Sequence, residues 1–225
     1  MKIPLWQHLL RFWEGDGALP VILGLLVVLV FVWPMLITPA HPLEHLRHFG
    51  FSALLLAGAM TAMKIRWLRI VVGAAVGVAL ALRWAAVAWP TEALHVGREV
   101  STLFLLALFC VIVGARAYRP GPVTSQRIMG AVAVYLLLGL GWEQAYELLY
   151  LLRPESFGGV DASTGPEAWT YFSFVTLTTV GYGDIVPVSP LARSLAISES
   201  LSGQIYLAVM LARLVALQIA PPAQD

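Results

Sequence analysis

The sequence predicts an all-α membrane protein with six transmembrane helices and one re-entrant segment between the fifth helix and the sixth. Hydrophobic residues make up 59% of the 225 residues and charged residues only 12%, whereas a soluble domain has about 25% charged residues. The mean hydropathy is +0.80. Six apolar segments approach the length of about 20 residues that a helix needs to cross a bilayer. A shorter, aromatic segment lies between the last two.

Six ranges are long and apolar enough to span: Leu19–Thr38, Leu43–Met63, Arg69–Trp89, Val100–Tyr118, Gln126–Leu152 and Pro190–Ile219. Prolines, which cannot continue the hydrogen bonds of a helix, lie at the ends of three of them: Pro34 and Pro39, Pro90, and Pro120. Residues 1–17 are amphipathic and contain Trp6 and Trp13, which predicts an interfacial segment. A partly ordered tail is the alternative for this segment.

The re-entrant segment, Glu167–Thr178, is too short to cross the bilayer and leads into the run TTVGYGD, Thr178 to Asp184. Two glycines flank an aromatic residue there, so the backbone can adopt conformations closed to residues with a Cβ. Its carbonyl oxygens can then all point one way, and four such strands around an axis form rings that replace the hydration shell of K⁺. A chance match in a soluble turn is the alternative. The apolar segments on both sides favour a pore loop.

From the fifth range to its end, the chain resembles the pore module of tetrameric potassium channels: outer helix, pore helix, selectivity filter and inner helix. Ser198–Leu217, SESLSGQIYLAVMLARLVAL, is similar to the inner helices of small bacterial potassium channels. The resemblance implies that six consecutive residues bind potassium ions: Thr178, Thr179, Val180, Gly181, Tyr182 and Gly183. It also places Gly203 where family members often have a gating hinge. Close helix packing explains a glycine there equally well.

Four segments with different roles are expected: an interfacial segment (1–17), a four-helix transmembrane domain (18–120), a pore domain (121–219) and a short cytoplasmic tail (220–225). Basic residues gather on one side of the predicted spans, which places both termini in the cytoplasm and the filter loop outside. We expect a multi-pass protein of a bacterial plasma (inner) membrane. One pore loop per chain cannot surround an ion, so a homotetramer is expected.

The topology resembles that of voltage-gated channels, but the fourth range lacks their ladder of arginines. Its only basic residue is Arg116, at the inner end, so little charge can move through the membrane field. Arg83 is a lone basic residue inside the third range. It is expected to pair with a carboxylate or to snorkel outward, and we favour snorkelling. Glu143 and Glu147 lie one turn apart on the outer half of the fifth range, where they can brace the pore loop or a neighbouring subunit, or enrich cations near the mouth.

Three further residues are candidates for supporting the filter: Asp184, Tyr171 and Glu199. A carboxylate within a span is costly unless it is paired or protonated. Glu199 is therefore expected to hydrogen-bond the back of the pore helix, where Tyr171, Ser173 and Thr176 are candidate partners. A structural brace is the favoured role for Glu199, and proton-sensitive gating is the alternative.

An outer cluster of four residues has the spacing of one helical face: His41, Glu44, His45 and His48. Imidazoles and a carboxylate so arranged can hold zinc or report pH. Histidines also occur at interfaces without a metal, and we favour that ordinary role.

The sequence as a whole predicts a channel that passes K⁺ passively, without strong dependence on voltage. The expected partners are K⁺, the lipid bilayer and further copies of the chain. No nucleic acid is expected, because the net charge is only +1 and no basic tail is present. No enzyme activity and no cofactor are expected besides potassium ions in the filter. The alternatives are a weakly selective cation channel and a non-conducting membrane sensor or scaffold.

Overall fold

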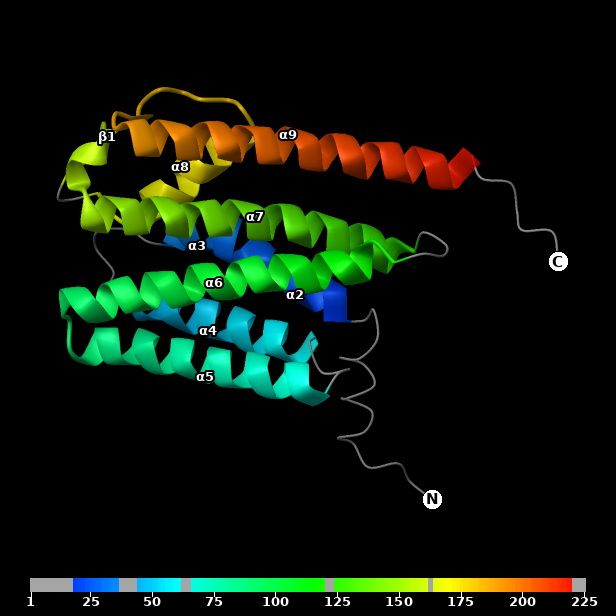
Figure 1. The fold of residues 1–225 in the computed structure, drawn as a ribbon, viewed down its shortest axis with the longest axis horizontal. Coiled ribbons are helices and arrows are strands. Elements are labelled where there is room, and N and C mark those ends of the chain that lie inside the picture. Colours follow the sequence, from blue (N-terminus) through cyan, green and yellow to red (C-terminus); the bar gives the residue numbers. More distant parts are fainter. Residues whose placement is uncertain (1–17, 37–43, 62–65, 120–123, 162–163, 220–225) are drawn as a thin grey trace, which may run out of the picture.

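A computed structural model describes residues 18–36, 44–61, 66–119, 124–161 and 164–219 of the chain. These residues form an all-helical bundle with one pair of two-residue strands. Figure 1 shows the long helices lying side by side, with the short helix α8 between α7 and α9. The predicted interfacial segment (1–17) and the predicted tail (220–225) lie outside the described residues.

The first predicted span is a composite helix that continues through Pro34. It consists of α2 (Ala18–Val27), a π-helical stretch (Val28–Val32) and α3 (Trp33–Leu36). The prediction that Pro34 ends the helix is therefore wrong. The proline ring would clash with the carbonyl of Val30, four residues earlier, in a regular α-helix. The wider π-helical turns immediately before Pro34 give room for that ring.

The next three helices are α4 (Glu44–Thr61), α5 (Arg66–Ala88) and α6 (Glu92–Ala117). Helix α6 begins eight residues before the predicted Val100, because Thr91 caps it: the Leu94 amide donates to Thr91 Oγ1 at 3.4 Å. Because of this earlier start, the helix contains Arg98 as well as Arg116, which was expected to be its only basic residue.

The last three helices have almost the predicted bounds. They are α7 (Ser125–Leu152), α8 (Glu167–Leu177) and α9 (Pro190–Ile219). Between α7 and α8, a 3-10 turn (Pro154–Ser156) leads into β1 (Phe157–Gly158), which pairs antiparallel with β2 (Val186–Pro187). This pairing joins the segment after α7 to the segment after the TTVGYGD run.

Two apolar cores hold the bundle together. The larger one combines residues of α2, α4, α5 and α6 with the first half of α7, from Ala133 to Leu140. The smaller one joins α7, α8 and α9 near the strand pair, and it consists of Tyr146, Leu149, Phe157, Trp169, Phe172, Ile185 and Ala192. Helix α7 therefore belongs to both cores and connects the first helices to the last ones.

Four described helices are long and apolar enough to cross a membrane: residues 69–88 of α5, α6, α7, and residues 190–213 of α9. The apolar parts of the first two predicted spans, Ala18–Val32 and His48–Met60, are shorter. The chain is thus a multi-pass membrane protein, and six spans remain a prediction.

Close packing of α8 on α7 depends on one glycine. A Cβ placed on Gly139 would overlap the ring of Phe174, whereas a Cβ on Gly141 would meet nothing within 4 Å. Phe174 therefore packs directly on the backbone of α7. The two glycines, separated by one residue in the same helix, form a matched pair for testing this contact.

We expect Gly139→Ala to destabilise the protein by about 1–3 kcal/mol, because the added methyl group displaces Phe174 from a filled site. Gly141→Ala is the control, and it should be neutral or slightly stabilising because alanine favours a helix. Thermal unfolding of the detergent-solubilised protein measures both. Equal midpoints for the two variants would contradict the packing described above.

Candidate functional site

The backbone of the TTVGYGD run alternates between two conformations. Thr179, Gly181 and Gly183 have φ of +62°, +55° and +82°, and the residues between them are not in this left-handed region. In a regular strand successive carbonyls point in opposite directions, and alternating the sign of φ turns them to a common side. Threonine rarely adopts a positive φ, and such strained residues cluster at functional sites.

The end of the pore helix α8 holds this loop by backbone hydrogen bonds. The amide of Thr179 donates to Thr176 O at 2.9 Å. The amides of Val180 and Gly181 both donate to Val175 O, at 2.8 and 3.2 Å. The start of the loop is therefore fixed by the last carbonyls of a buried helix rather than by its own side chains.

Two tyrosines and one carboxylate surround the far end of the loop. The Tyr171 hydroxyl donates to the Asp184 carboxyl, and the ring of Tyr171 stacks on Tyr182 at 6.3 Å and 6°. This hydrogen bond lowers the pKa of Asp184 below its usual value and raises the pKa of Tyr171 to about 12. The structure thus brings together two of the three predicted support residues, Tyr171 and Asp184.

A turn beyond α7 closes over the segment that follows the loop. Gly159 has a φ of +82°, and a Cβ there would overlap the carbonyl oxygen of Asp184. The amides of Val188 and Ser189 both donate to Ser156 O, at 2.8 and 3.2 Å. Neither Gly159 nor Ser156 was singled out in the sequence. The only available signal was the glycine pair at 158–159 in an otherwise ordinary loop.

Glu199, the third predicted support residue, lies behind the pore helix and is fully buried. Its Oε1 contacts Ser173 Oγ at 2.5 Å, as expected, and its Oε2 accepts from the Tyr146 hydroxyl at 2.5 Å. The other two predicted partners are engaged elsewhere: Thr176 O accepts from Ser200 Oγ at 3.1 Å, and Tyr171 contacts Asp184. Tyr146 was missed because nothing in the sequence indicates which residue of α7 faces α9.

Gly203 lies where α9 passes the end of the pore helix. It is buried, and a Cβ there would overlap the carbonyl oxygen of Leu177. Close packing accounts for this glycine, and a gating hinge at Gly203 stays a prediction.

One chain leaves the loop and the adjacent helix uncovered. Val180 and Tyr182 are 53% and 72% exposed. An apolar face of α9 is exposed as well, and it consists of Ile197, Leu201, Ile205, Leu207, Val209 and Leu211. These apolar side chains are exposed in the single chain.

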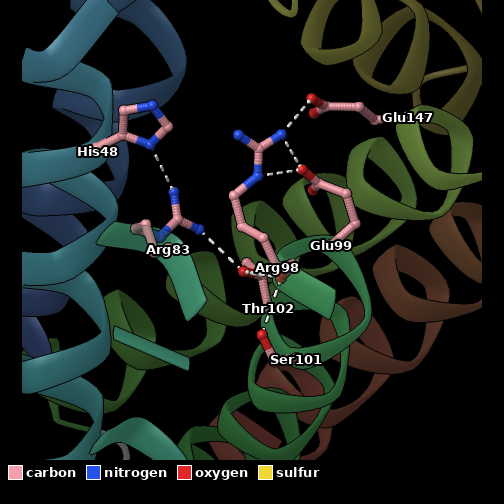
Figure 2. A network of polar contacts seen from close by, with 7 residues as sticks. All are labelled: His48, Arg83, Arg98, Glu99, Ser101, Thr102 and Glu147. Atoms are coloured by element: carbon pink, nitrogen blue, oxygen red, sulfur yellow. Dashed lines mark hydrogen bonds and ion pairs between the residues drawn. The ribbon is translucent and has the colours of Figure 1, made fainter. Parts of the chain in front are cut away.

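Arg83 is buried among the first helices and does not snorkel outward. It is 3% exposed, donates to Thr102 Oγ1 at 2.9 Å and lies 4.9 Å from the ring centroid of Phe51. Its Nη1 also lies 3.4 Å from His48 Nδ1. Figure 2 shows Arg83 between His48 on α4 and Thr102 on α6. The favoured prediction for Arg83 is wrong, because neighbouring helices supply polar partners inside the bundle.

A second charged group lies next to this network and reaches α7 (Figure 2). Arg98 on α6 forms an ion pair with the adjacent Glu99. It also lies 3.4 Å from Glu147 on α7. Glu147 therefore links α7 to α6 within one chain, and the pore loop is not its partner in this contact. The Arg83 contacts and the Arg98 contacts are joined by one hydrogen bond, in which Thr102 Oγ1 donates to Arg98 O at 2.8 Å.

The predicted histidine cluster lies at the start of α4, which begins at Glu44. His41 lies outside the described residues. His48 contacts Arg83, as above. Among the residues that the structure describes, no group of three or more histidine, cysteine or acidic side chains could hold a metal ion. A metal or pH-sensing role for the four residues stays a prediction.

Comparison with known protein families matches residues 149–218 to a family described as ion channel. The matched region runs from the end of α7 through the pore helix and the loop to the inner helix. It therefore covers the glycine-rich loop and the elements that position it.

Curated proteins similar to this chain are potassium channels or their subunits. Two-pore potassium channel 5 of Arabidopsis thaliana is 31% identical over 43% of this chain and 22% of its own length. Inward rectifier potassium channel Kirbac3.1 of Paramagnetospirillum magnetotacticum is 34% identical over 34% of this chain and 27% of its own length. Delayed-rectifier potassium channel regulatory subunit KCNS1 of Pan troglodytes is 30% identical over 52% of this chain and 22% of its own length.

The chain thus spans only about a quarter of the length of these relatives. No solved structure matches it.

The Tyr171–Asp184 contact predicts how the carboxyl of Asp184 titrates. The pKa of Asp184 is lower in the folded protein than its ordinary value of 3.8. The contact therefore stabilises the folded protein at pH values above 3.8, and this stabilisation is lost as the pH falls through the pKa of the folded state. We expect Tyr171→Phe to move the Asp184 pKa up towards 3.8. Carboxyl NMR of aspartate-labelled protein measures it.

Tyr150→Phe is the control, since the Tyr150 hydroxyl donates to Asp161 O and not to Asp184. The same Asp184 pKa in wild type and Tyr171→Phe would show that this contact does not form in solution.

Proposed function

We propose that the chain is a subunit of a potassium-selective channel that passes K⁺ passively, from the premise that its residues 149–218 match a family described as ion channel. The match to the ion-channel family and the similarity to potassium channels support a membrane channel protein rather than an enzyme. Potassium selectivity, the assembly and the gating are our proposals.

The alternating backbone of Thr179, Gly181 and Gly183 is the observation that carries the proposal. It is the conformation that a stack of inward-pointing carbonyls requires, and rings of such carbonyls replace the hydration shell of K⁺. We propose that residues Thr178 to Gly183 bind the permeant ions. The hydrogen bonds to Val175 O and Thr176 O would keep these carbonyls in place as ions pass.

The uncovered face of α9 supports assembly around a symmetry axis. Apolar residues of α9 are exposed over about four turns, from Ile197 to Leu211. We propose a homotetramer, because four identical loops form complete carbonyl rings at one axis.

The arrangement of the helices supports the predicted topology. In Figure 1, the start of α2, the end of α6 and the start of α7 lie towards one end of the bundle, and β1 lies towards the other. We propose six spans in a bacterial plasma membrane, both termini in the cytoplasm and the loop outside. The four proposed segments are those predicted: residues 1–17, 18–120, 121–219 and 220–225.

The charges in the first helices support weak dependence on voltage. Arg83 is hydrogen-bonded inside the bundle, and Arg98 is paired with Glu99 and Glu147. A voltage sensor needs several charges that move through the field, each worth about 2.3 kcal/mol per 100 mV. We propose that the open probability is nearly flat with voltage. Single-channel recording over a range of voltages tests this, and a steep curve would overturn it.

A second candidate is a regulatory subunit that contributes to a channel formed with other chains. One relative is named a regulatory subunit of a potassium channel, which favours this possibility. A weakly selective cation pore is the alternative within the conducting class.

Selectivity is the direct test of the proposed function. Liposomes that contain the purified chain should take up Rb⁺ and K⁺ but little Na⁺. Gly181→Ala should abolish uptake or selectivity, because a Cβ at a φ of +55° strains the backbone that must present the carbonyls. Gly141→Ala, in open space on α7, is the control. Equal Na⁺ and K⁺ uptake by the wild type would overturn potassium selectivity, and no uptake would favour the regulatory candidate.

Assembly is tested by mass. The detergent-solubilised complex, after correction for bound detergent, should have four times the 24.5 kDa of one chain. Replacing Leu201 and Ile205 on the exposed face of α9 with asparagine should shift the mass towards the single chain. A stable monomer that conducts would be incompatible with this proposal.

A further inference from the structure

Three hydrogen-bonding contacts meet at Glu199 and Ser173 behind the pore helix. Tyr146 Oη lies 2.5 Å from Glu199 Oε2, and Ser173 Oγ lies 2.5 Å from Glu199 Oε1. Ser173 Oγ also lies 2.7 Å from the carbonyl oxygen of Gly139. All three separations are those of full O–H···O hydrogen bonds, so each contact requires a hydrogen atom of its own.

The two hydroxyl groups supply only two of these three hydrogens. A carbonyl oxygen cannot donate, so the Ser173 hydroxyl must donate to Gly139 O. Its oxygen then accepts in the contact with Glu199, and the hydrogen there must come from Oε1. The Tyr146 hydroxyl donates to Oε2, which leaves no donor or acceptor in the group unsatisfied.

The ionised alternative leaves a contact without a hydrogen. If Glu199 were a carboxylate, Ser173 and Tyr146 would both donate to it. The oxygens of Ser173 and Gly139 would then face each other at 2.7 Å with no hydrogen between them. Among the described residues, no cation pairs with Glu199, and a fully buried carboxylate without a counter-ion is strongly unfavourable.

We propose that Glu199 is held as the neutral acid and acts as a positioning residue that fixes the pore helix through the relay Glu199–Ser173–Gly139. Helix α9 supplies the proton, α8 passes on the hydrogen bond, and α7 accepts it. Tyr146 completes the group from α7. The part of the proposal that concerns the pore helix rests on the proposed function, whereas the protonation state does not.

Two further hydrogen bonds near this relay join α9 to α7 and to α8. Trp142 Nε1 on α7 donates to Ser202 Oγ on α9 at 3.2 Å, and Ser200 Oγ donates to Thr176 O at 3.1 Å. Thr176 O also accepts from the amide of Thr179, at the start of the proposed filter. A displacement of α9 at Glu199 would thus reach the filter within one turn of α8.

Infrared difference spectroscopy tests the protonation state directly. The spectrum of the full chain minus that of Glu199→Gln should contain the carbonyl stretch of a protonated carboxylic acid. Ser173→Ala should shift this band, because the acid loses its acceptor, and Ser198→Ala, an exposed site on the same helix, should leave it unchanged. If the difference spectrum instead contains the paired bands of an ionised carboxylate, the proposal is wrong.

Rescue by the amide tests the positioning role. Glutamine can accept from Tyr146 and donate to Ser173, so Glu199→Gln should keep the wild-type unfolding midpoint and K⁺ uptake. Glu199→Ala should lower the ratio of folded to unfolded protein by about 5- to 30-fold, and its uptake should fall with the loss of an ordered filter. Loss of uptake in Glu199→Gln equal to that in Glu199→Ala would overturn the role. A wild type that passes no K⁺ but shows the acid band would count against the proposed function alone.

Discussion

The position of the pore helix α8 between α7 and α9 is the constraint on which the rest of the structure depends. Two glycines make it possible, because α8 touches the backbone of α7 at Gly139 and that of α9 at Gly203. At this distance a side chain of any size would push α8 away. The last carbonyls of α8 then fix the loop that follows, through the amides of Thr179, Val180 and Gly181. The backbone geometry of the proposed filter therefore depends on how α8 packs between α7 and α9.

Polar groups complete this arrangement where glycine alone cannot. Apolar packing is non-directional, and it would allow α8 to rotate or slide between its neighbours. The Glu199–Ser173 contact and the Tyr171–Asp184 contact fix the middle of α8, one to α9 and the other to the end of the loop. The segment beyond the loop is held by a different device, the close approach of Gly159 to Asp184 O and the short strand pair. Each end of the loop therefore has its own anchor on a rigid element.

The sequence predicted the features that depend on local signals and missed those that depend on contacts between distant residues. The bounds of α7, α8 and α9 were close because apolar length and flanking prolines determine them. The continuation through Pro34 was missed, since a π-helical stretch has no sequence signature. The burial of Arg83 was also missed, because its partners lie on α4 and α6 and only the fold brings them together. Ser173 was named as a partner of Glu199, but Tyr146 could not be, since helix rotation decides which residue faces α9.

Buried polar groups are stabilised differently in helices α4 to α6 and in helices α7 to α9. Around Arg83 and Arg98, charge is retained and is balanced by carboxylates, a hydroxyl and an aromatic face. Around Glu199, the described partners are hydroxyl groups, and the balance of hydrogens requires a neutral acid. Ion pairs depend little on direction, whereas hydrogen bonds weaken steeply as the angle at the hydrogen bends. A relay of hydrogen bonds is therefore suited to the helix that must be placed most accurately, and the charged network is suited to joining α6 to α7, where the packing core already sets the distance.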